Sequence, residues 1–123
     1  MAKGLQKNKE YLQALSLLGK TLLRRSNRRC ELSDVTGELV IYDLDGPKLD
    51  PSLDHVVHVS PMARDWLDGS PINPHEARHL ESAVWSEHPA VARAALTLLR
   101  RIDEPWAREA AESAQMMIDS FES

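Results

Sequence analysis

The sequence contains a single cysteine and no long apolar run. One cysteine cannot form a disulfide within the chain, which agrees with a reducing compartment. A membrane-spanning helix needs about 20 consecutive apolar residues, and the longest apolar runs here are only a few residues. The lysines near the N-terminus are not followed by the apolar segment of a signal peptide. We therefore expect a soluble, cytoplasmic protein with no membrane partner.

The motifs of several enzyme classes are also missing. The sequence has no glycine-rich phosphate loop, no nucleophile elbow of the G-x-S-x-G type and no dinucleotide-binding fingerprint. The net charge of −4 argues against a general nucleic-acid binder, because such proteins gain affinity from Lys and Arg contacts with phosphate. A local basic patch is still compatible with that total charge.

The length and composition predict one domain of the α+β class that is mostly helical. With 123 residues, of which 42% are hydrophobic, the chain can bury one modest core. No internal repeat or interdomain linker is visible. We expect an N-terminal helix in residues 1–27, a β-hairpin module in residues 28–70 and a helical part in residues 71–123.

The β-hairpin is predicted from two short β-branched segments. Leu39 to Leu44 and His55 to Val59 have the apolar and β-branched content of strands. Residues 45–51 between them are rich in Asp, Gly and Pro and are expected to form the connecting loop. Ser60 then offers an N-cap for a helix, and Pro61 suits the first helical position.

Helices are predicted from apolar residues at helical spacing. They are expected over residues 5–25, 61–68, 73–85, 91–102 and 105–121. The fourth has the clearest periodicity, with Val91, Ala94, Ala95, Leu98 and Leu99 on one face. In the fifth, a stripe is formed by Trp106, Ala110, Ala114, Met117 and Phe121, and the last two helices are expected to pack as a hairpin.

One stretch matches a zinc-protease pattern. His75-Glu76-Ala77-Arg78-His79 fits H-E-x-x-H, in which two histidines one helical turn apart hold zinc while the glutamate activates a water. This motif supports one alternative function, a metal-dependent hydrolase using His75, Glu76 and His79, with Asp43 or Asp45 nearby in space.

Three physical arguments weigh against that alternative. Pro74 places the motif in the first turn of the predicted helix, where the pair would lie in solvent rather than in a dry cavity. Glu76 is already explained as the acid of a capping box that begins at Asn73. Arg78 puts a positive charge beside the proposed cation. A pair of solvated surface histidines is the simpler interpretation.

Four arginines lie within six residues at the end of the first predicted helix, namely Arg24, Arg25, Arg28 and Arg29. Positive charge is favourable at a helix C-terminus, so dipole complementation and solubility explain the cluster simply. The other interpretation is a binding site for an anion or a nucleic acid. Both stay open at the level of sequence.

Five ordered pieces of the chain, spread over residues 18 to 107, match a known pattern. They are Leu18-Gly19-Lys20 leading to Arg28-Arg29-Cys30-Glu31-Leu32, Leu39-Val40-Ile41-Tyr42, Arg78-x-Leu80, Trp85-Ser86-Glu87-x-Pro89-Ala90-Val91, and Trp106-Ala107. In this set the chain resembles the bacterial PhnA-like proteins, which are named for alkylphosphonate utilisation. The resemblance implies a zinc ribbon related in shape to treble clefs.

The resemblance also implies four cysteine ligands, and most are replaced here. The positions that would carry them are Cys30, Ser33, Ser60 and Ala63. Alanine cannot bind zinc, and a neutral hydroxyl is a poor substitute for a thiolate. We therefore expect a treble-clef-like hairpin module that folds without metal, and no cofactor.

These observations favour a non-enzymatic binding or assembly module with a degenerate zinc ribbon. Its expected partner is another protein or a second copy of itself. The two alternatives are the hydrolase built on His75, Glu76 and His79 and the anion or nucleic-acid binder built on the arginine cluster.

Overall fold

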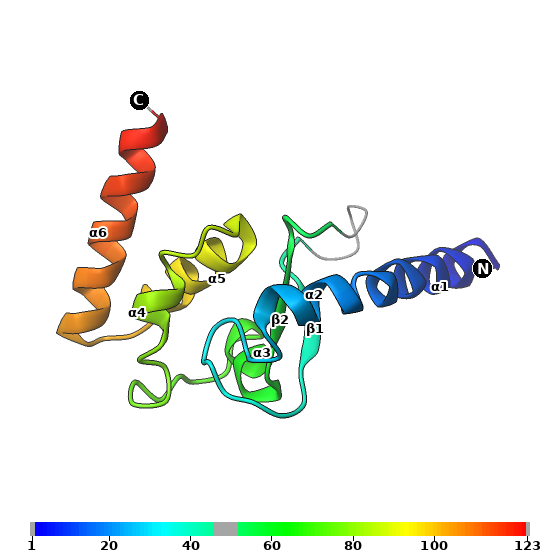
Figure 1. The fold of residues 1–123 in the computed structure, drawn as a ribbon, viewed down its shortest axis with the longest axis horizontal. Helices are drawn as coiled ribbons and strands as arrows, with labels where there is room; N and C mark the ends of the chain where they lie inside the picture. Colours follow the sequence, from blue (N-terminus) through cyan, green and yellow to red (C-terminus); the bar gives the residue numbers. More distant parts are fainter. Residues whose placement is uncertain (1, 46–51, 123) are drawn as a thin grey trace.

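The computed structural model describes residues 2–45 and 52–122 (Figure 1). Its elements in chain order are α1 (Ala2–Leu17), α2 (Gly19–Ser26), β1 (Val40–Asp43), β2 (Val56–Val59), α3 (Pro61–Leu67), α4 (Leu80–Ala83), α5 (Pro89–Leu99) and α6 (Pro105–Glu122). The prediction of an α+β fold that is mostly helical is confirmed. No helix in the described part of the chain is long and apolar enough to cross a membrane.

The predicted β-hairpin is confirmed. Strands β1 and β2 are antiparallel, and the pairs run from Val40 opposite Val59 to Asp43 opposite Val56. The predicted loop between them falls largely on residues 46–51, which lie outside the described residues.

Strand β2 is buried on both faces, because all four of its residues are buried. Val57 and Val59 belong to the main hydrophobic core, which also contains α5. Side chains alternate along a strand, so Val56 and His58 face the other way. Ser26 lies on that side, with its Oγ 3.5 Å from Nδ1 of His58. Helix α2 therefore covers the second face of the hairpin.

The N-terminal residues are helical as predicted, but not as one helix, since the chain breaks at Leu18 into α1 and α2. Gly19 follows directly, and glycine has low helix propensity because its backbone loses the most freedom on ordering. Helix α1 extends away from the body (Figure 1). Tyr11 anchors it, since its hydroxyl donates to Oδ2 of Asp43 at 2.6 Å.

Helix α3 begins where the sequence predicts. Ser60 is its N-cap, with Oγ accepting a hydrogen bond from the backbone N–H of Ala63 at 3.2 Å, and Pro61 is the first helical residue. The chain leaves the helix at Gly69, whose φ of 108° lies in the region that favours glycine. Trp66 is buried in the core, as expected.

The predicted helix over residues 73–85 is wrong for most of its length, because residues 74–79 form turns and α4 covers only Leu80–Ala83. The Asn73 side chain accepts from the N–H of His75 at 2.9 Å, two residues on, as in an Asx-turn. The next backbone bonds join residues three apart, such as Glu76 N–H to Asn73 C=O. This local network competes with an α-helical start.

Helix α5 forms the centre of the core, and the predicted face of Val91, Ala94, Ala95, Leu98 and Leu99 is buried. Helix α6 packs on it through the part that begins at Pro105, where the small residues Ala107, Ala111 and Ala114 are buried. The predicted stripe on α6 is therefore partly wrong. Met117 on that stripe is exposed, because the second half of α6 stands clear of the body (Figure 1).

Candidate anion-binding surface

The arginine side chains divide into two groups by their contacts. All arginines of the chain lie in the described ranges, and all except Arg24 and Arg28 make a hydrogen bond or ion pair there. The bonded ones are Arg25, Arg29, Arg64, Arg78, Arg93, Arg100, Arg101 and Arg108. The two unbonded arginines both belong to the predicted cluster, and both are exposed.

Arg25 is not available to bind a ligand, because its side chain is buried in contacts within the protein. Its guanidinium contacts the Glu31 carboxylate through two hydrogen bonds of 2.7 Å, and the two side chains are only 8% and 5% exposed. The same guanidinium donates to the carbonyls of Leu53 and Val56. The four predicted arginines therefore do not form one binding surface.

Glu31 completes this junction from the turn that follows α2. Its Oε1 also accepts the backbone N–H of His58 at 2.7 Å, and its own N–H donates to the His58 carbonyl. The Arg25–Glu31 pair thus joins α2, the turn at residues 30–35 and strand β2. A buried charge pair of this kind needs such additional hydrogen bonds to offset its desolvation.

The end of α2 turns the chain so that Arg28 lies beside Arg24. Asn27 and Arg28 have φ values of 55° and 59°, two successive residues in the left-handed region. The Arg28 N–H donates to the Leu23 carbonyl at 3.1 Å, which ties the turn back onto the helix. An L-residue with a side chain is strained by about 1–2 kcal/mol in this region. The tertiary structure holds Arg28 there despite that strain.

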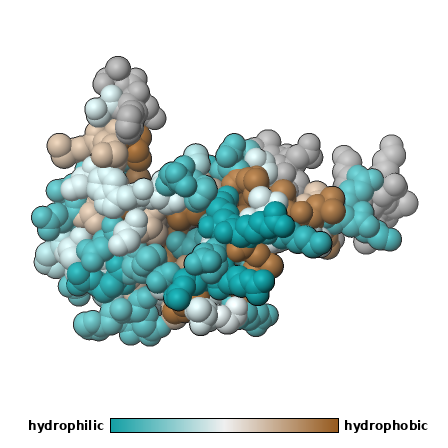
Figure 2. Space-filling view, viewed as in Figure 1, coloured by the Kyte–Doolittle hydropathy of each residue, from teal (hydrophilic) through white to brown (hydrophobic). Residues whose placement is uncertain are grey.

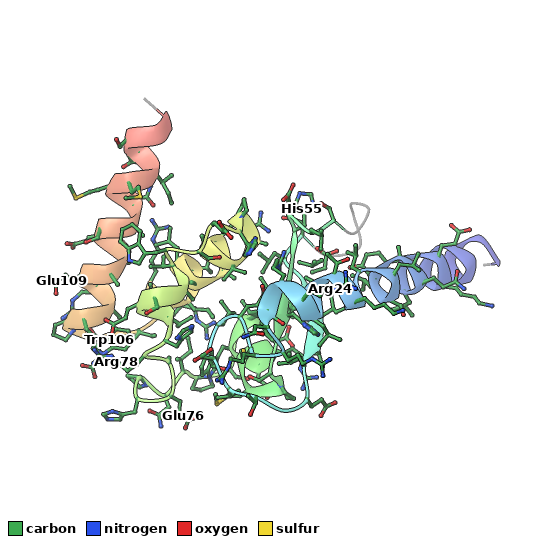
Figure 3. All side chains as sticks on the ribbon, viewed as in Figure 1. Arg24, His55, Glu76, Arg78, Trp106 and Glu109 are labelled. Carbon is green, nitrogen blue, oxygen red and sulfur yellow. The ribbon has the colours of Figure 1, made fainter. Side chains whose placement is uncertain are left out.

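Lys20, Leu23, Arg24, Asn27 and Arg28 line a shallow, open depression of about 430 Å³. None of the described carboxylates lines it. Lys20 and Arg24 are one helical turn apart on α2, and Arg28, just beyond the end of the helix, lines the same depression. We call these three cations the α2 stripe. Figure 2 shows strongly hydrophilic side chains over this helix, and Figure 3 places Arg24 on it.

His58 lies behind the α2 stripe and adds no charge to it at neutral pH. Together with Arg28 it lines a second hollow, next to Gly37 and Leu39. Burial lowers the pKa of His58 and Arg25 lowers it further, while the negative charge of Glu31 acts in the opposite direction. The imidazole of His58 is therefore neutral at neutral pH.

Arg29, the last arginine of the predicted cluster, contacts its own turn. Its guanidinium donates to the Asp34 carbonyl at 3.3 Å and lies 3.9 Å from the Asp34 carboxylate. Both side chains are about half exposed. Arg29 is therefore partly neutralised and lies outside the α2 stripe, whereas Lys20, which we did not predict, belongs to it.

The H-E-x-x-H residues do not assemble a metal site. His75 and Glu76 are exposed and lie in turns, so the one-turn helical spacing of the motif is not formed (Figure 3). Glu76 accepts a hydrogen bond from the Asn73 side chain, and the Arg78 guanidinium stacks over the ring of Trp106 at 4.5 Å. Within residues 2–45 and 52–122, no group of three His, Cys, Asp or Glu side chains is placed to hold a metal.

The two aspartates suggested as further ligands have other contacts. Asp43 accepts the hydroxyl of Tyr11. Asp45 lies 3.1 Å from the Arg93 guanidinium and 3.6 Å from the ring of His55. Neither carboxylate joins the histidines of the motif, so the geometry gives the hydrolase no catalytic centre in the described chain.

The positions of the zinc-ribbon pattern do not fit zinc either. Cys30 is buried, and its sulfur accepts the backbone N–H of Ser33 at 3.3 Å. The Ser33 hydroxyl is buried and has no hydrogen-bond partner among the described residues. The Ser60 hydroxyl caps α3, and the side chain of Ala63 has no ligand atom. One thiol cannot supply the four donors of a structural zinc site.

No family model, no curated protein and no solved structure matches this chain. The resemblance to the PhnA-like proteins therefore rests on the residues that carry it and stays a prediction.

Proposed function

We propose that the protein is a non-enzymatic binding module and that the α2 stripe binds a chain of phosphate groups. The observation that carries this proposal is the contact pattern of the arginines. Arg24 and Arg28 are the ones without a hydrogen-bonding or ion-pair partner in the described residues, and they lie side by side in one depression with Lys20. Unpaired, exposed guanidinium groups are suited to bidentate contacts with phosphate.

The shape of the stripe favours an extended ligand. Lys20 and Arg24 are about 6 Å apart along the axis of α2 at 1.5 Å per residue, and Arg28 follows beyond the end of the helix. The depression is shallow and open, so it would not enclose a single small anion. A linear polyanion, such as a nucleic-acid backbone or polyphosphate, can place successive phosphates along such a row.

The net charge of −4 limits the expected affinity. Three phosphate contacts should give a slope of roughly −2 to −3 in a plot of log K against log salt concentration. The stripe has no aromatic residue on which bases could stack. We therefore expect weak, salt-sensitive binding with little sequence preference.

The test is a fluorescence-anisotropy titration of a labelled single-stranded RNA at about 50 and about 200 mM salt. Arg24→Gln/Arg28→Gln should weaken binding at low salt by about tenfold or more and flatten the salt slope by about two. The matched control is Arg64→Gln/Arg108→Gln, which removes the same charge from two exposed arginines paired with Asp65 and Asp103. The control should bind as the parent does.

Competition with unlabelled DNA and with inorganic polyphosphate identifies the source of the phosphates. Equal competition indicates recognition of the phosphate chain alone, whereas preference for RNA indicates contacts with the ribose. The proposal is wrong if the parent shows no binding at low salt, or if both double variants lose the same affinity.

We further propose that the hairpin and its preceding turn are a zinc-ribbon relative that folds without metal, as the resemblance to PhnA-like proteins implies. The order of turn, hairpin and capped helix supports this proposal. So does the Arg25–Glu31 pair, which joins the turn to the hairpin by contacts that require no metal. The hydrolase alternative has no supporting contact of this kind.

A further inference from the structure

Helices α1 and α6 protrude from the body of the molecule and carry exposed apolar residues. Most of the exposed large apolar side chains lie on α1 and on the second half of α6, namely Leu12, Leu17, Met116, Met117 and Ile118. Leu17 is 82% exposed and Met116 is 72% exposed. Apolar surface reaches the outside along both helices (Figure 2). Exposure of this kind on two protruding helices favours burial against a partner.

The two helices carry opposite charge. Helix α1 contains three lysines and one glutamate, whereas α6 contains four carboxylates and one arginine. On α1, Lys9 and Leu12 are three residues apart and share a face. On α6, Met116 and Asp119 are three residues apart and also share a face. Each helix therefore presents an apolar side chain beside a charge that complements the other helix.

The geometry of one molecule keeps α1 and α6 apart, because they lie at opposite ends of its longest axis (Figure 1). Pairing between two α1 helices would bring lysines together, and pairing between two α6 helices would bring carboxylates together. Like charges at an interface oppose association and unlike charges favour it. In charge, α1 is therefore complementary to α6 of another molecule.

We propose that the protein associates with a second copy of itself, with α1 of each molecule packed against the second half of α6 of the other. This proposal does not rest on the phosphate-binding function, because the α2 stripe takes no part in it. A reciprocal dimer makes the helix contact twice. Helix α1 has 16 residues and is about 24 Å long. Two helix contacts bury about twice the area of one, which brings the interface closer to the size of stable protein–protein interfaces.

The test measures molecular mass by light scattering and sedimentation over a wide range of protein concentration. The parent should be dimeric at high concentration. Lys7→Glu/Lys9→Glu reverses charge on α1, and Glu112→Lys/Asp119→Lys reverses charge on α6. Each variant alone should dimerise at least tenfold more weakly, because its α1 and α6 then carry the same sign. An equimolar mixture of the two variants should dimerise again, since both contacts in the mixed dimer join opposite charges.

Apolar contacts are tested with Leu17→Gln/Met116→Gln, which should also weaken the dimer at least tenfold. The control is Val35→Thr, a change at an exposed apolar residue outside both helices. It should leave the mass unchanged. Circular dichroism checks that each variant keeps its helices. The proposal is overturned if the parent is monomeric at every concentration, if reversal on α6 alone has no effect, or if the mixture stays monomeric.

Discussion

The Arg25–Glu31 pair joins elements that are distant in sequence. Arg25 reaches carbonyls 28 and 31 residues away, and Glu31 holds the backbone of β2. Removing one partner of a buried ion pair leaves a charge without compensation, which is more destabilising than losing an ordinary hydrogen bond.

Glu31→Ala and Arg25→Met should each lower the free energy of unfolding by about 3–5 kcal/mol, measured by urea denaturation. The double variant should lose less than the sum of the two, because neither charge is then left alone. It should still be less stable than the parent, since the backbone groups of Leu53, Val56 and His58 lose their partners.

The control for this cycle is Arg29→Met, at an exposed ion pair with Asp34. An exposed pair contributes about 0–1 kcal/mol. If the Arg25 and Glu31 effects are strictly additive, the pair does not act as a unit.

His58 makes stability depend on pH. Burial lowers its folded-state pKa below 6.5, so the unfolded chain binds the proton more readily. The stability that the folded protein gains from the neutral form of His58 is fully present above pH 6.5. It is lost as the pH falls through the folded-state pKa. His58→Gln should therefore flatten the decline in stability below pH 6.5, measured by urea denaturation across the pH series.

At the scale of elements, the turn at residues 30–35 is held by protein contacts. The Cys30 N–H donates to the Val35 carbonyl, and the Asp34 N–H donates to the Cys30 carbonyl. We predict that the purified protein carries no stoichiometric zinc and keeps its thermal midpoint in EDTA, because the donor set is incomplete. Metal analysis beside a melting curve measures both quantities.

A positive control for that measurement restores the missing ligands. Ser33→Cys/Ser60→Cys/Ala63→Cys, together with the native Cys30, supplies the four thiols that the resemblance to PhnA-like proteins implies. This variant should bind one zinc per chain and lose stability in EDTA. Zinc bound by the parent would contradict the prediction, and a triple variant that folds but binds none would contradict the resemblance.

Elements with a strong local signal were predictable from the sequence. The Ser60-Pro61 start of α3 and its exit at Gly69 depend on neighbouring residues, and α5 has an unbroken apolar face. Residues 74–79 were not predictable in the same way. Asn73 can cap a helix or close an Asx-turn with similar hydrogen bonds, and the choice depends on the packing around it.

At the scale of the whole molecule, the candidate site also combines features that the local sequence predicts with features that depend on distant residues. Arg24 and Arg25 are adjacent and look alike in the sequence, yet one faces solvent and the other is buried against Glu31. Their difference arises from partners on β2 and in the turn before the hairpin, which no local pattern specifies. Lys20 could have been found, because it lies one helical turn before Arg24.

The outline of the molecule also affects how it moves through solvent. A compact chain of 123 residues has a radius of gyration of about 14 Å, whereas α1 alone is about 24 Å long and extends from the body opposite to α6. The two protruding helices increase frictional drag without adding mass. A single molecule should therefore have the Stokes radius of a larger globular protein and leave a gel-filtration column early, even where no second copy is bound.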